Sequence, residues 1–479
     1  MTLPNTTEFY INGTFTPSID GTDVPVMNPS HDKPCATVTL GGAQDGEAAI
    51  AAAKSAFISW SQSSKQERIA LVERILEAYK SHREALALAI STEMGAPIDY
   101  ATNAQVTAGI WHIENFLMAI KDFDYIKQLG PHAPHDRIAY EPVGVVGLIT
   151  PWNWPMNQVT LKVIPALLAG CTMVLKPSEI APLSSQIFAK IMDEAGTPAG
   201  VFNMVHGDGL GIGTMLSGHK DIDMISFTGS TRAGEAISQN AAKTLKRVHL
   251  ELGGKGANII FDDADEKAAK RGAIHCFNNT GQSCNAPTRM LVSRARYDEA
   301  VATAKSVAEM MTPDHAEKSG RHIGPVVSAV QYDKIQALIA TGIDEGAELI
   351  AGGTGKPEGL DDGYFVKPTV FANVNNNMTI AREEIFGPVL SILPFDSEEE
   401  AIAIANDTPY GLTNYIQSQN PETCQRVARA LRSGMVEING VGRERMSPFG
   451  GMKASGNGRE GGIWGIEDFM EIKAISGWQ

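Results

Sequence analysis

The chain has few cysteines, and none of them form a Cys-x-x-Cys pair. Its 479 residues include five, at Cys35, Cys171, Cys276, Cys284 and Cys424. Such an odd and scattered set argues against a disulfide framework and against a thiolate zinc site. It predicts no bound metal and a protein that stays in a reducing compartment, most simply the cytoplasm. One reactive thiol remains compatible with this pattern.

Long apolar runs and an excess of positive charge are also missing. The longest apolar stretches, Val143–Ile149 and Ile164–Cys171, are far shorter than the ~20 residues that cross a bilayer. No basic stretch followed by an apolar run opens the chain, so we expect no signal peptide. Lys and Arg number 40 against 55 Asp and Glu, a net charge of −15. This surplus repels phosphate backbones and anionic lipids and argues against a nucleic-acid or peripheral-membrane role, though not against a small anionic ligand.

The composition is that of an ordinary globular protein. It is 43% hydrophobic and 20% charged, and its length corresponds to about three structural units. After residue 143, apolar strand-like runs alternate with helical stretches, which predicts parallel sheets covered by helices on both faces. A second α/β unit is expected after Glu251. The predicted strands are Gly144–Thr150, Thr172–Lys176, Phe202–His206, Met224–Thr228, Ala257–Phe261, Arg289–Val292 and Val389–Pro394.

Outside this alternation, the first 142 residues predict a hairpin, three helices and an excursion. Asn12-Gly13 supplies a two-residue turn between short strands at 8–11 and 14–16. Helices are expected near 43–60, 65–93 and 100–120 from their apolar spacing. Residues 125–140 carry Gly, Pro and His without a clear period, which predicts an arm that interrupts a domain.

Two glycine clusters lie where a phosphate could bind. Gly207–Gly213 follows a strand and opens a helix, but Ile212 and Thr214 stand where the dinucleotide fingerprint needs its last glycine. The second cluster, Gly229–Gly234, has Walker spacing, yet Glu235 replaces the phosphate-binding lysine, so a nucleotide triphosphatase is not expected. Taken alone, either cluster is more often an ordinary tight turn.

Three polar residues are candidates for chemistry. Cys284 lies in a small, polar, Gly-containing loop, although an isolated cysteine is as often a small buried hydrophobe. Glu251 ends an apolar strand before two glycines, where burial raises a carboxyl pKa into the range of a general base. Asn153 follows a strand at the edge where such sheets bind ligands. The alternatives are a solvated carboxylate for Glu251 and a structural turn for Asn153.

Together these segments resemble the signature series of the NAD(P)-dependent aldehyde dehydrogenase superfamily, in its hydrolytic form that does not use coenzyme A. The resemblance covers essentially the whole chain. The motifs that carry it occur in the family's order: Pro151-Trp152-Asn153-Trp154-Pro155, Lys176-Pro177-Ser178-Glu179, Phe227-Thr228-Gly229-Ser230, Glu251-Leu252-Gly253-Gly254-Lys255, Gly281-Gln282-Ser283-Cys284, Glu383-Glu384-Ile385-Phe386-Gly387-Pro388 and Pro448-Phe449-Gly450-Gly451.

The resemblance implies an α/β fold of three parts. Residues 1–123 and 143–251 would form a Rossmann-like NAD-binding domain, and residues 252–443 an α/β catalytic domain. Residues 124–142 and 444–479 would form a small β arm for oligomerisation and the return to the cofactor domain. The arm would pair with a last strand near 469–475, and the protein would be a homodimer or homotetramer.

The resemblance also implies a mechanism. Cys284 would attack the aldehyde carbon, and the Asn153 side chain with the Cys284 backbone N–H would hold the resulting oxyanion. Glu251 would activate the water that releases a carboxylic acid from the Cys284 thioester. Relatives that transfer the acyl group to coenzyme A lack this glutamate, so its presence favours hydrolysis. A non-catalytic protein that kept only the fold is disfavoured because all three residues are intact.

NAD is the implied cofactor, with NADP use remaining possible. Lys176 and Glu179 would hold the adenine ribose, where the Glu179 carboxylate suits a free 2′-hydroxyl and repels a 2′-phosphate. The resemblance also places Lys176 among the catalytic residues. Glu384 and Phe386 would lie near the nicotinamide. The other implied cofactor residues are Ile149, Thr150, Trp152, Ser178, Gly209, Gly213, Phe227, Thr228, Gly229, Ser230, Leu252 and Gly253.

The aldehyde itself is less well specified. Residues that flank the catalytic positions are expected to line its tunnel: Trp154, Gln158, Leu161, Phe277, Ser283 and Asn285. Arg443 and Arg445 just precede the Pro448 motif, where many relatives have apolar or aromatic side chains. We expect Arg443 or Arg445 to meet a polar or carboxylate-bearing aldehyde, and the alternative is a solvated basic loop.

Overall fold

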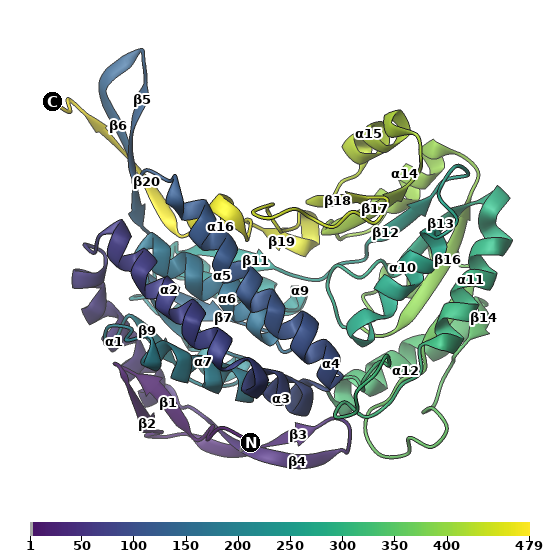
Figure 1. Cartoon of the computed structure of the whole chain (residues 1–479), viewed down its shortest axis with the longest axis horizontal. Helices are drawn as coiled ribbons and strands as arrows, with labels where there is room; N and C mark the ends of the chain where they lie inside the picture. Colours follow the sequence, from purple (N-terminus) through teal and green to yellow (C-terminus); the bar gives the residue numbers. More distant parts are fainter. Residues whose placement is uncertain (1–2) are drawn as a thin grey trace.

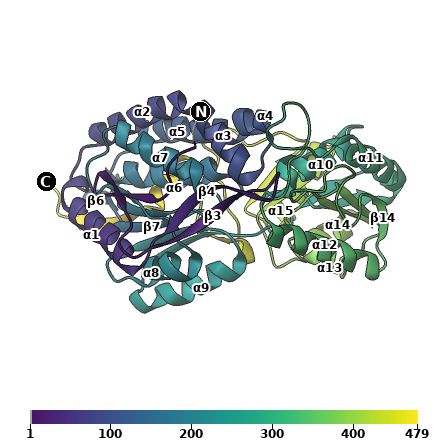
Figure 2. The same ribbon diagram turned by 90° about the horizontal axis from the view of Figure 1, so that it is seen from below.

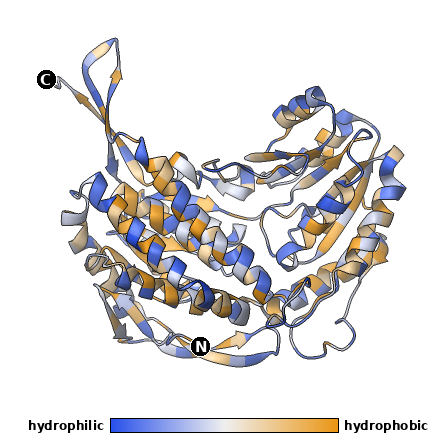
Figure 3. Cartoon of the chain, in the orientation of Figure 1, coloured by the Kyte–Doolittle hydropathy of each residue, from blue (hydrophilic) through white to orange (hydrophobic). Residues whose placement is uncertain are grey.

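Two sheets organise two lobes of the chain, and a slender arm projects from the first lobe (Figure 1). The computed structural model describes residues 3–479. Figure 3 shows the strands of both sheets as largely apolar and the outer helices as mixed, the pattern of buried sheets covered by amphipathic helices. No helix within residues 3–479 is both long and apolar enough to span a bilayer.

The first sheet has eight strands in the order β19-β11-β10-β7-β8-β9-β1-β2, and its five central strands, β11 to β9, are parallel. The predicted hairpin forms its far edge. The strands are β1 (Glu8–Ile11), β2 (Thr14–Pro17), β7 (Val145–Ile149), β8 (Thr172–Lys176), β9 (Phe202–Met204), β10 (Met224–Thr228), β11 (Arg247–Glu251) and β19 (Gly456–Asn457).

Alternate side chains of this sheet enter two separate cores, because successive residues of a strand point to opposite faces. In β7, Val146 and Leu148 pack into a large core formed with α2, α5, α6 and α7. Val145 and Ile149 pack into a smaller core with α1, α8 and α9. The helices of this lobe are α1 (Ala43–Trp60), α2 (Lys65–Ser81), α3 (Arg83–Met94), α4 (Ile98–Tyr100), α5 (Val106–Lys121), α6 (Pro155–Ala169), α7 (Leu183–Glu194), α8 (Thr214–Gly218), α9 (Thr231–Ala241) and α16 (Gly462–Glu467).

The second sheet has seven strands in the order β14-β15-β16-β13-β12-β17-β18, all parallel except the edge strand β14. Its strands are β12 (Ala257–Ile260), β13 (Arg289–Ser293), β14 (Glu348–Ala351), β15 (Thr369–Ala372), β16 (Val389–Phe395), β17 (Thr413–Gln417) and β18 (Met435–Ile438). The helices that cover it are α10 (Ala268–Phe277), α11 (Tyr297–Met310), α12 (Ala329–Asp344), α13 (Thr379–Arg382), α14 (Glu398–Asn406) and α15 (Pro421–Ala430).

The arm consists of the strands β5 (Ile126–Gly130), β6 (Ala133–Pro142) and β20 (Met470–Ser476). Of these, β20 lies near the carboxyl end of the chain. The expected pairing of the excursion with the last strand is confirmed, from Met470 opposite Pro142 to Ser476 opposite Asp136. Short helical turns complete the structure, with π geometry at Ala101–Gln105 and Gly209–Gly213 and 3-10 geometry at Ala242–Thr244, Asn278–Gly281, Arg294–Arg296 and Lys453–Ser455.

The strands β14, β15, β17 and β18 were not predicted from the sequence, and two further differences concern the first lobe. The helix expected over 65–93 is two helices, because His82 leaves helical geometry with φ −93° and ψ 9° and separates α2 from α3. A hairpin that was not predicted, β3 (Thr22–Asn28) with β4 (Lys33–Leu40), passes towards the second lobe, as Figure 2 shows. Its turn contacts that lobe through a hydrogen bond from the Tyr364 N–H to Pro29 O (3.0 Å).

Candidate active site

Cys284 lies where two cavities meet between the lobes, and within residues 3–479 it is the one residue that lines both. The first, here called the aromatic cavity, has a volume of about 380 Å³ and is lined by Thr107, Ala108, Trp111, His112, Trp154, Asn157, Gln158, Leu161, Cys284, Asn285, Arg443 and Phe449. The second, here called the glycine cavity, has a volume of about 200 Å³ and is lined by Pro151, Trp152, Asn153, Thr228, Gly229, Ser230, Leu252, Gly253, Cys284, Gln331, Lys334, Glu384 and Phe386. A nucleophile at this junction can reach a ligand in either cavity.

Strand ends bring the polar residues to this junction. Strands β7, β10 and β11 are parallel neighbours, so their carboxyl ends meet at one edge of the first sheet. Asn153 follows β7, Thr228 ends β10, and Glu251 ends β11. The ligand edge expected for an open α/β sheet is therefore the edge that faces Cys284 of the second lobe.

The loop that carries Cys284 depends on glycine at two points. Asn279, Thr280 and Gly281 all have left-handed backbones, with φ of 54°, 57° and 70°. A Cβ at Gly281 would fall 2.1 Å from Gly387 O, and one at Gly254 would fall 2.2 Å from Cys284 O. The Gly281 and Gly254 positions of the sequence motifs therefore allow the loop to pack against its neighbours and the end of β11 to approach the nucleophile.

A buried amide network holds Asn153 against this loop. Asn153 Nδ2 donates to Gln282 O (3.0 Å), while Asn153 O accepts from Gln105 Nε2 (3.0 Å) and from Asn279 Nδ2 (3.1 Å). The Asn153 amide keeps a second N–H that this bond does not use. Within residues 3–479, no oxygen accepts from the Cys284 backbone N–H. Asn153 and Cys284 thus each offer a donor beside the thiol.

The Cys284 thiol is held in its neutral form. Burial raises its pKa well above the ordinary value of 9.0, and the nearby carboxylates of Glu251 and Glu384 raise it further. Ionisation of this thiol therefore requires a base or a positive charge brought into the site.

The Glu251 carboxylate is buried, and burial makes it a stronger base. Its side chain is 2% exposed, and neither of its oxygens has a hydrogen-bond partner within residues 3–479. Burial raises its pKa well above 4.5, and the Glu460 charge adds to the shift while Lys162 opposes it. Such a carboxylate is a stronger base than one in water, as a group that takes a proton from water must be.

The glycine cavity offers groups suited to a nucleotide cofactor. Thr228 lines this cavity, and its Oγ1 is buried with no hydrogen-bond partner in the part of the chain that the structure describes. Ser230 caps α9, whose first N–H groups favour an anion such as a pyrophosphate. At the end of β8, Lys176 Nζ donates to Gly207 O (2.6 Å) and to Glu179 Oε2 (3.2 Å). These donors and acceptors fit a phosphate and a ribose diol.

Comparisons of the sequence and the structure with known proteins identify the family. The model of the aldehyde dehydrogenase family matches residues 15–475. The chain belongs to the aldehyde dehydrogenase family.

Individual relatives cover its whole length. A 3-succinoylsemialdehyde-pyridine dehydrogenase from Pseudomonas sp. is 49% identical over 98% of both chains. The crystal structure of an aldehyde dehydrogenase from Bartonella henselae superposes with a TM-score of 0.98 at 59% identity, over 100% of both chains. A mutant of aldehyde dehydrogenase C from Pseudomonas syringae, in complex with NAD+ and octanal, superposes with a TM-score of 0.97 at 44% identity, over 99% of this chain and 97% of that one.

The structure of this aldehyde dehydrogenase separates the residues expected at its site into groups. Of those expected at the cofactor, Trp152, Thr228, Gly229, Ser230, Leu252, Gly253, Glu384 and Phe386 line the glycine cavity. Lys176, Glu179 and Gly213 gather beyond it, at the end of β8. The remaining expected residues line neither cavity: Ile149, Thr150, Ser178, Gly209 and Phe227.

The residues expected at the aldehyde divide similarly. Trp154, Gln158, Leu161, Asn285 and Arg443 line the aromatic cavity. Ser283 Oγ accepts a hydrogen bond from Trp154 Nε1 (2.8 Å). In contrast, Phe277 is buried in the apolar core beneath α10. Arg445 lies outside the cavity, where Nη2 is 3.7 Å from Glu114 Oε2.

Several lining residues were not predicted from the sequence. Lys334 Nζ donates to Glu384 O (2.8 Å), and Gln331 Nε2 donates to Phe386 O (2.9 Å), so α12 supports the Glu384 loop. Trp111 and His112 enter the aromatic cavity from α5. Their sequence signal is a helical apolar stripe, which does not distinguish a core position from a cavity wall.

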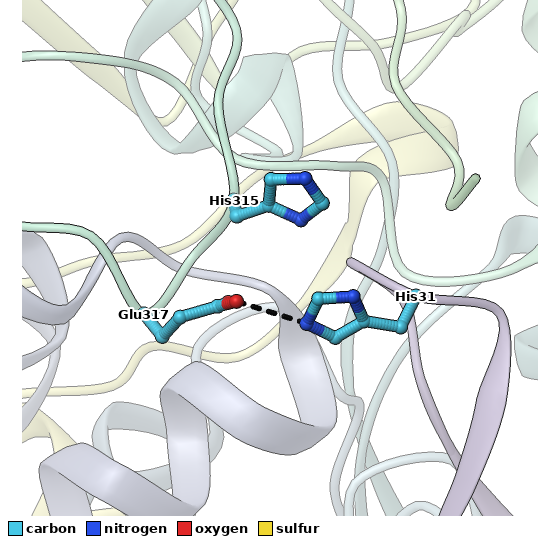
Figure 4. Close-up of side chains that lie close together, drawn as sticks. All are labelled: His31, His315 and Glu317. Atoms are coloured by element: carbon cyan, nitrogen blue, oxygen red, sulfur yellow. Dashed lines mark hydrogen bonds and ion pairs between the residues drawn. The ribbon is translucent and has the colours of Figure 1, made fainter. Parts of the chain in front are cut away.

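A cluster of two histidines and a glutamate lies between the lobes (Figure 4). His31, in the β3–β4 turn, pairs with Glu317 (2.9 Å) and stacks on His315 at a centroid distance of 4.9 Å. The ring planes differ by 18°. Such nearly parallel planes do not direct two nitrogen lone pairs to one point, so the cluster is a stacked, hydrogen-bonded group rather than a metal centre.

Replacement of Asn153 by alanine removes one of the two donors beside the thiol. We expect kcat to fall by about 10²–10³-fold, because the donor acts on charge that develops only as the thiol attacks. Steady-state NADH formation measures this loss. Asn157→Ala is the matched control: Asn157 lies on α6 and binds His112 Nε2 (2.6 Å), and its removal should change KM more than kcat. Wild-type kcat in Asn153→Ala would exclude the amide from the oxyanion site.

Proposed function

We propose that this aldehyde dehydrogenase oxidises an aldehyde with NAD and releases the acid by hydrolysis. The observation that carries the proposal is the position of Cys284, which alone lines both the aromatic cavity and the glycine cavity. The aldehyde would occupy the first cavity and the nicotinamide the second. The thiol would then lie between the carbon that loses hydride and the group that accepts it.

Each step uses a residue of the chain. The Cys284 thiolate bonds to the aldehyde carbon, while Asn153 Nδ2–H and the Cys284 N–H stabilise the oxygen that becomes negative. When bound, NAD supplies the positive charge that favours the thiolate and the acceptor for the hydride. Glu251 then takes a proton from water, whose oxygen bonds to the thioester carbon as the carbon–sulfur bond breaks. The products are the carboxylic acid, NADH and a proton, and the Cys284 thiol is restored.

The residues at the cofactor site support NAD over NADP. Glu179, beside Lys176, would bind the hydroxyls of the adenine ribose, and its negative charge repels a 2′-phosphate. Glu384, held by the Gly254 N–H (2.8 Å), would orient the second ribose near Phe386. Solved relatives bind NAD+, among them an aldehyde dehydrogenase from Bacillus cereus that is 38% identical with a TM-score of 0.94, over 99% of this chain and 96% of that one.

We further propose the domain division given by the resemblance and a homodimer or homotetramer built through the arm. Large apolar side chains stand exposed on it: Ile126 (49%), Leu129 (47%), Ile472 (67%) and Trp478 (40%). Exposed apolar groups gathered on so small a unit are typical of a surface that a partner covers. The five free cysteines favour the cytoplasm.

A panel of short, long, aromatic and carboxylated aldehydes tests the proposal, with NAD and NADP supplied in turn. NADH should form faster than NADPH, and the other product should be the free acid. Added coenzyme A should change neither the rate nor the product, because Glu251 directs water to the thioester. An acyl-coenzyme A product would favour the acylating alternative. A folded, reduced enzyme inactive on every aldehyde would favour the non-catalytic one.

A further inference from the structure

We propose that Arg443 binds a carboxylate at the far end of the substrate, so that the enzyme's preferred aldehyde is a semialdehyde or oxo acid. The inference rests on the proposed function, because it names the substrate class of the same site. Arg443 and Cys284 line one cavity, so a molecule whose aldehyde carbon reaches the thiol can place its other end at the guanidinium.

Among the described residues, 3–479, Arg443 is the one charged residue in the lining of the aromatic cavity. The other lining side chains are aromatic, aliphatic, amide, hydroxyl, thiol and imidazole groups. The imidazole belongs to His112, where burial lowers the pKa to about 4, so this ring is neutral near pH 7. The positive charge that a ligand meets in this cavity therefore comes from the Arg443 guanidinium alone.

The orientation of this guanidinium is set by its neighbours while its hydrogen-bonding groups remain open. Arg443 Cζ lies 4.8 Å from the centre of the Phe449 ring, a cation–π contact. Its nearest acidic atom is Glu437 Oε1, 3.8 Å from Nε and too far for a hydrogen bond. Within residues 3–479 the guanidinium makes no hydrogen bond, so Nη1 and Nη2 are both available for a bidentate pair with a carboxylate.

Burial makes an anionic ligand favourable here. The Arg443 side chain is only 26% exposed, so its charge is largely shielded from water, and this burial lowers its pKa. A ligand carboxylate would offset this cost with charge-assisted hydrogen bonds. Glu437 competes only weakly, because it lies in the lining of a neighbouring cavity with Lys267, Lys270 and Arg271. Burial also raises the Glu437 pKa, which shows that this carboxylate is itself partly shielded from water.

The structure decides between the two arginines of this loop. Arg445, two residues later, is 52% exposed and lies by Glu114 and Met118, outside the aromatic cavity. One guanidinium balances the single charge of a carboxylate, whereas a phosphate dianion would leave one negative charge unbalanced in this cavity. Carboxylate is therefore the anion that the lining favours.

The test compares kcat/KM for two matched pairs, succinic semialdehyde against butanal and adipic semialdehyde against hexanal. The wild-type enzyme should prefer the carboxylated member of at least one pair. Arg443→Gln should lower this preference by about 10- to 100-fold, the value of a charge-assisted bidentate contact. The ratio cancels any common effect of the Arg443 charge on the Cys284 thiol, which both substrates share.

Two further variants make the test specific. Glu437→Gln removes the competing carboxylate and should raise the preference about two- to fivefold, in the opposite direction. Arg445→Gln makes the same charge change outside the cavity and should leave the preference unchanged. If Arg443→Gln does not fold, two other experiments replace it. Arg443→Lys should lose part of the preference for carboxylated substrates. Succinate should protect Cys284 of the wild-type enzyme from alkylation by iodoacetamide.

Several outcomes would overturn the inference. An unchanged preference in Arg443→Gln, an equal loss in Arg445→Gln or a higher kcat/KM for glyceraldehyde 3-phosphate would each exclude carboxylate recognition by Arg443. Absence of succinate protection would do the same. Because butanal and hexanal are oxidised without a carboxylate, Cys284-dependent NADH formation from them separates a failure of this inference from a failure of the proposed function.

Discussion

Cys284→Ala is expected to abolish NADH formation from every aldehyde, with a loss of at least about 10⁴-fold. Without the thiol, the aldehyde carbon does not become tetrahedral, and no hydride donor forms in the cavity. Cys284 is also the one residue that lines both cavities, so no other side chain can take over its position. Steady-state NADH absorbance with saturating butanal measures the effect.

Cys276→Ala is the matched control, because it removes a second thiol from the same lobe. Cys276 is fully buried in the core beneath α10 and lies in neither cavity. Activity should be retained, with a small loss of thermal stability from the cavity that remains. If Cys276→Ala lost activity and Cys284→Ala kept it, Cys284 would not be the nucleophile.

Glu251→Gln is expected to stop turnover after a single reaction. The amide has the size of the carboxylate but takes no proton from water, so the thioester forms and is not hydrolysed. We expect a burst of one NADH per active site and then a steady rate about 10²–10⁴-fold below that of the wild type. Stopped-flow absorbance resolves both phases. Glu235→Gln, an exposed substitution in α9, should show neither change, and a normal steady rate in Glu251→Gln would exclude Glu251 as the base.

The same residue determines the pH dependence of the wild-type enzyme. Burial raises the Glu251 pKa well above 4.5, so the base is protonated and inactive at low pH. The kcat should therefore rise with pH through that raised pKa, at a pH above 4.5. This rise of kcat with pH should be absent in Glu251→Gln, because the variant has no carboxyl group to titrate at that position.

The chemistry at the strand ends was largely predictable from the sequence. Asn153 and Glu251 each follow an apolar run, and parallel strands bring their carboxyl ends to one edge. Cys284 was recognisable only with the motifs around it, because a lone cysteine in a polar loop is compatible with a buried structural role. The glycines of those motifs have a packing reason: Gly254 and Gly281 leave space for backbone oxygens of other segments.

Other features depend on contacts between distant segments and left no local signal. Arg443 and Arg445 stand in one short loop with the same charge, and only packing against Phe449 or Glu114 separates them. Lys334 and Gln331 read as ordinary polar positions of α12, although they hold the backbone near Glu384. The break at His82 also escaped detection, since apolar spacing continues across it from α2 into α3.

The central claim is that Cys284 carries the acyl group between oxidation and hydrolysis. The most direct test is the intact mass of Glu251→Gln after mixing with NAD and excess hexanal, followed by peptide mapping. The account predicts one adduct, on the peptide that contains Cys284, heavier by the mass of hexanal less two hydrogens, in the same amount as the NADH formed. NADH without a covalent adduct, or an adduct on another residue, would contradict it.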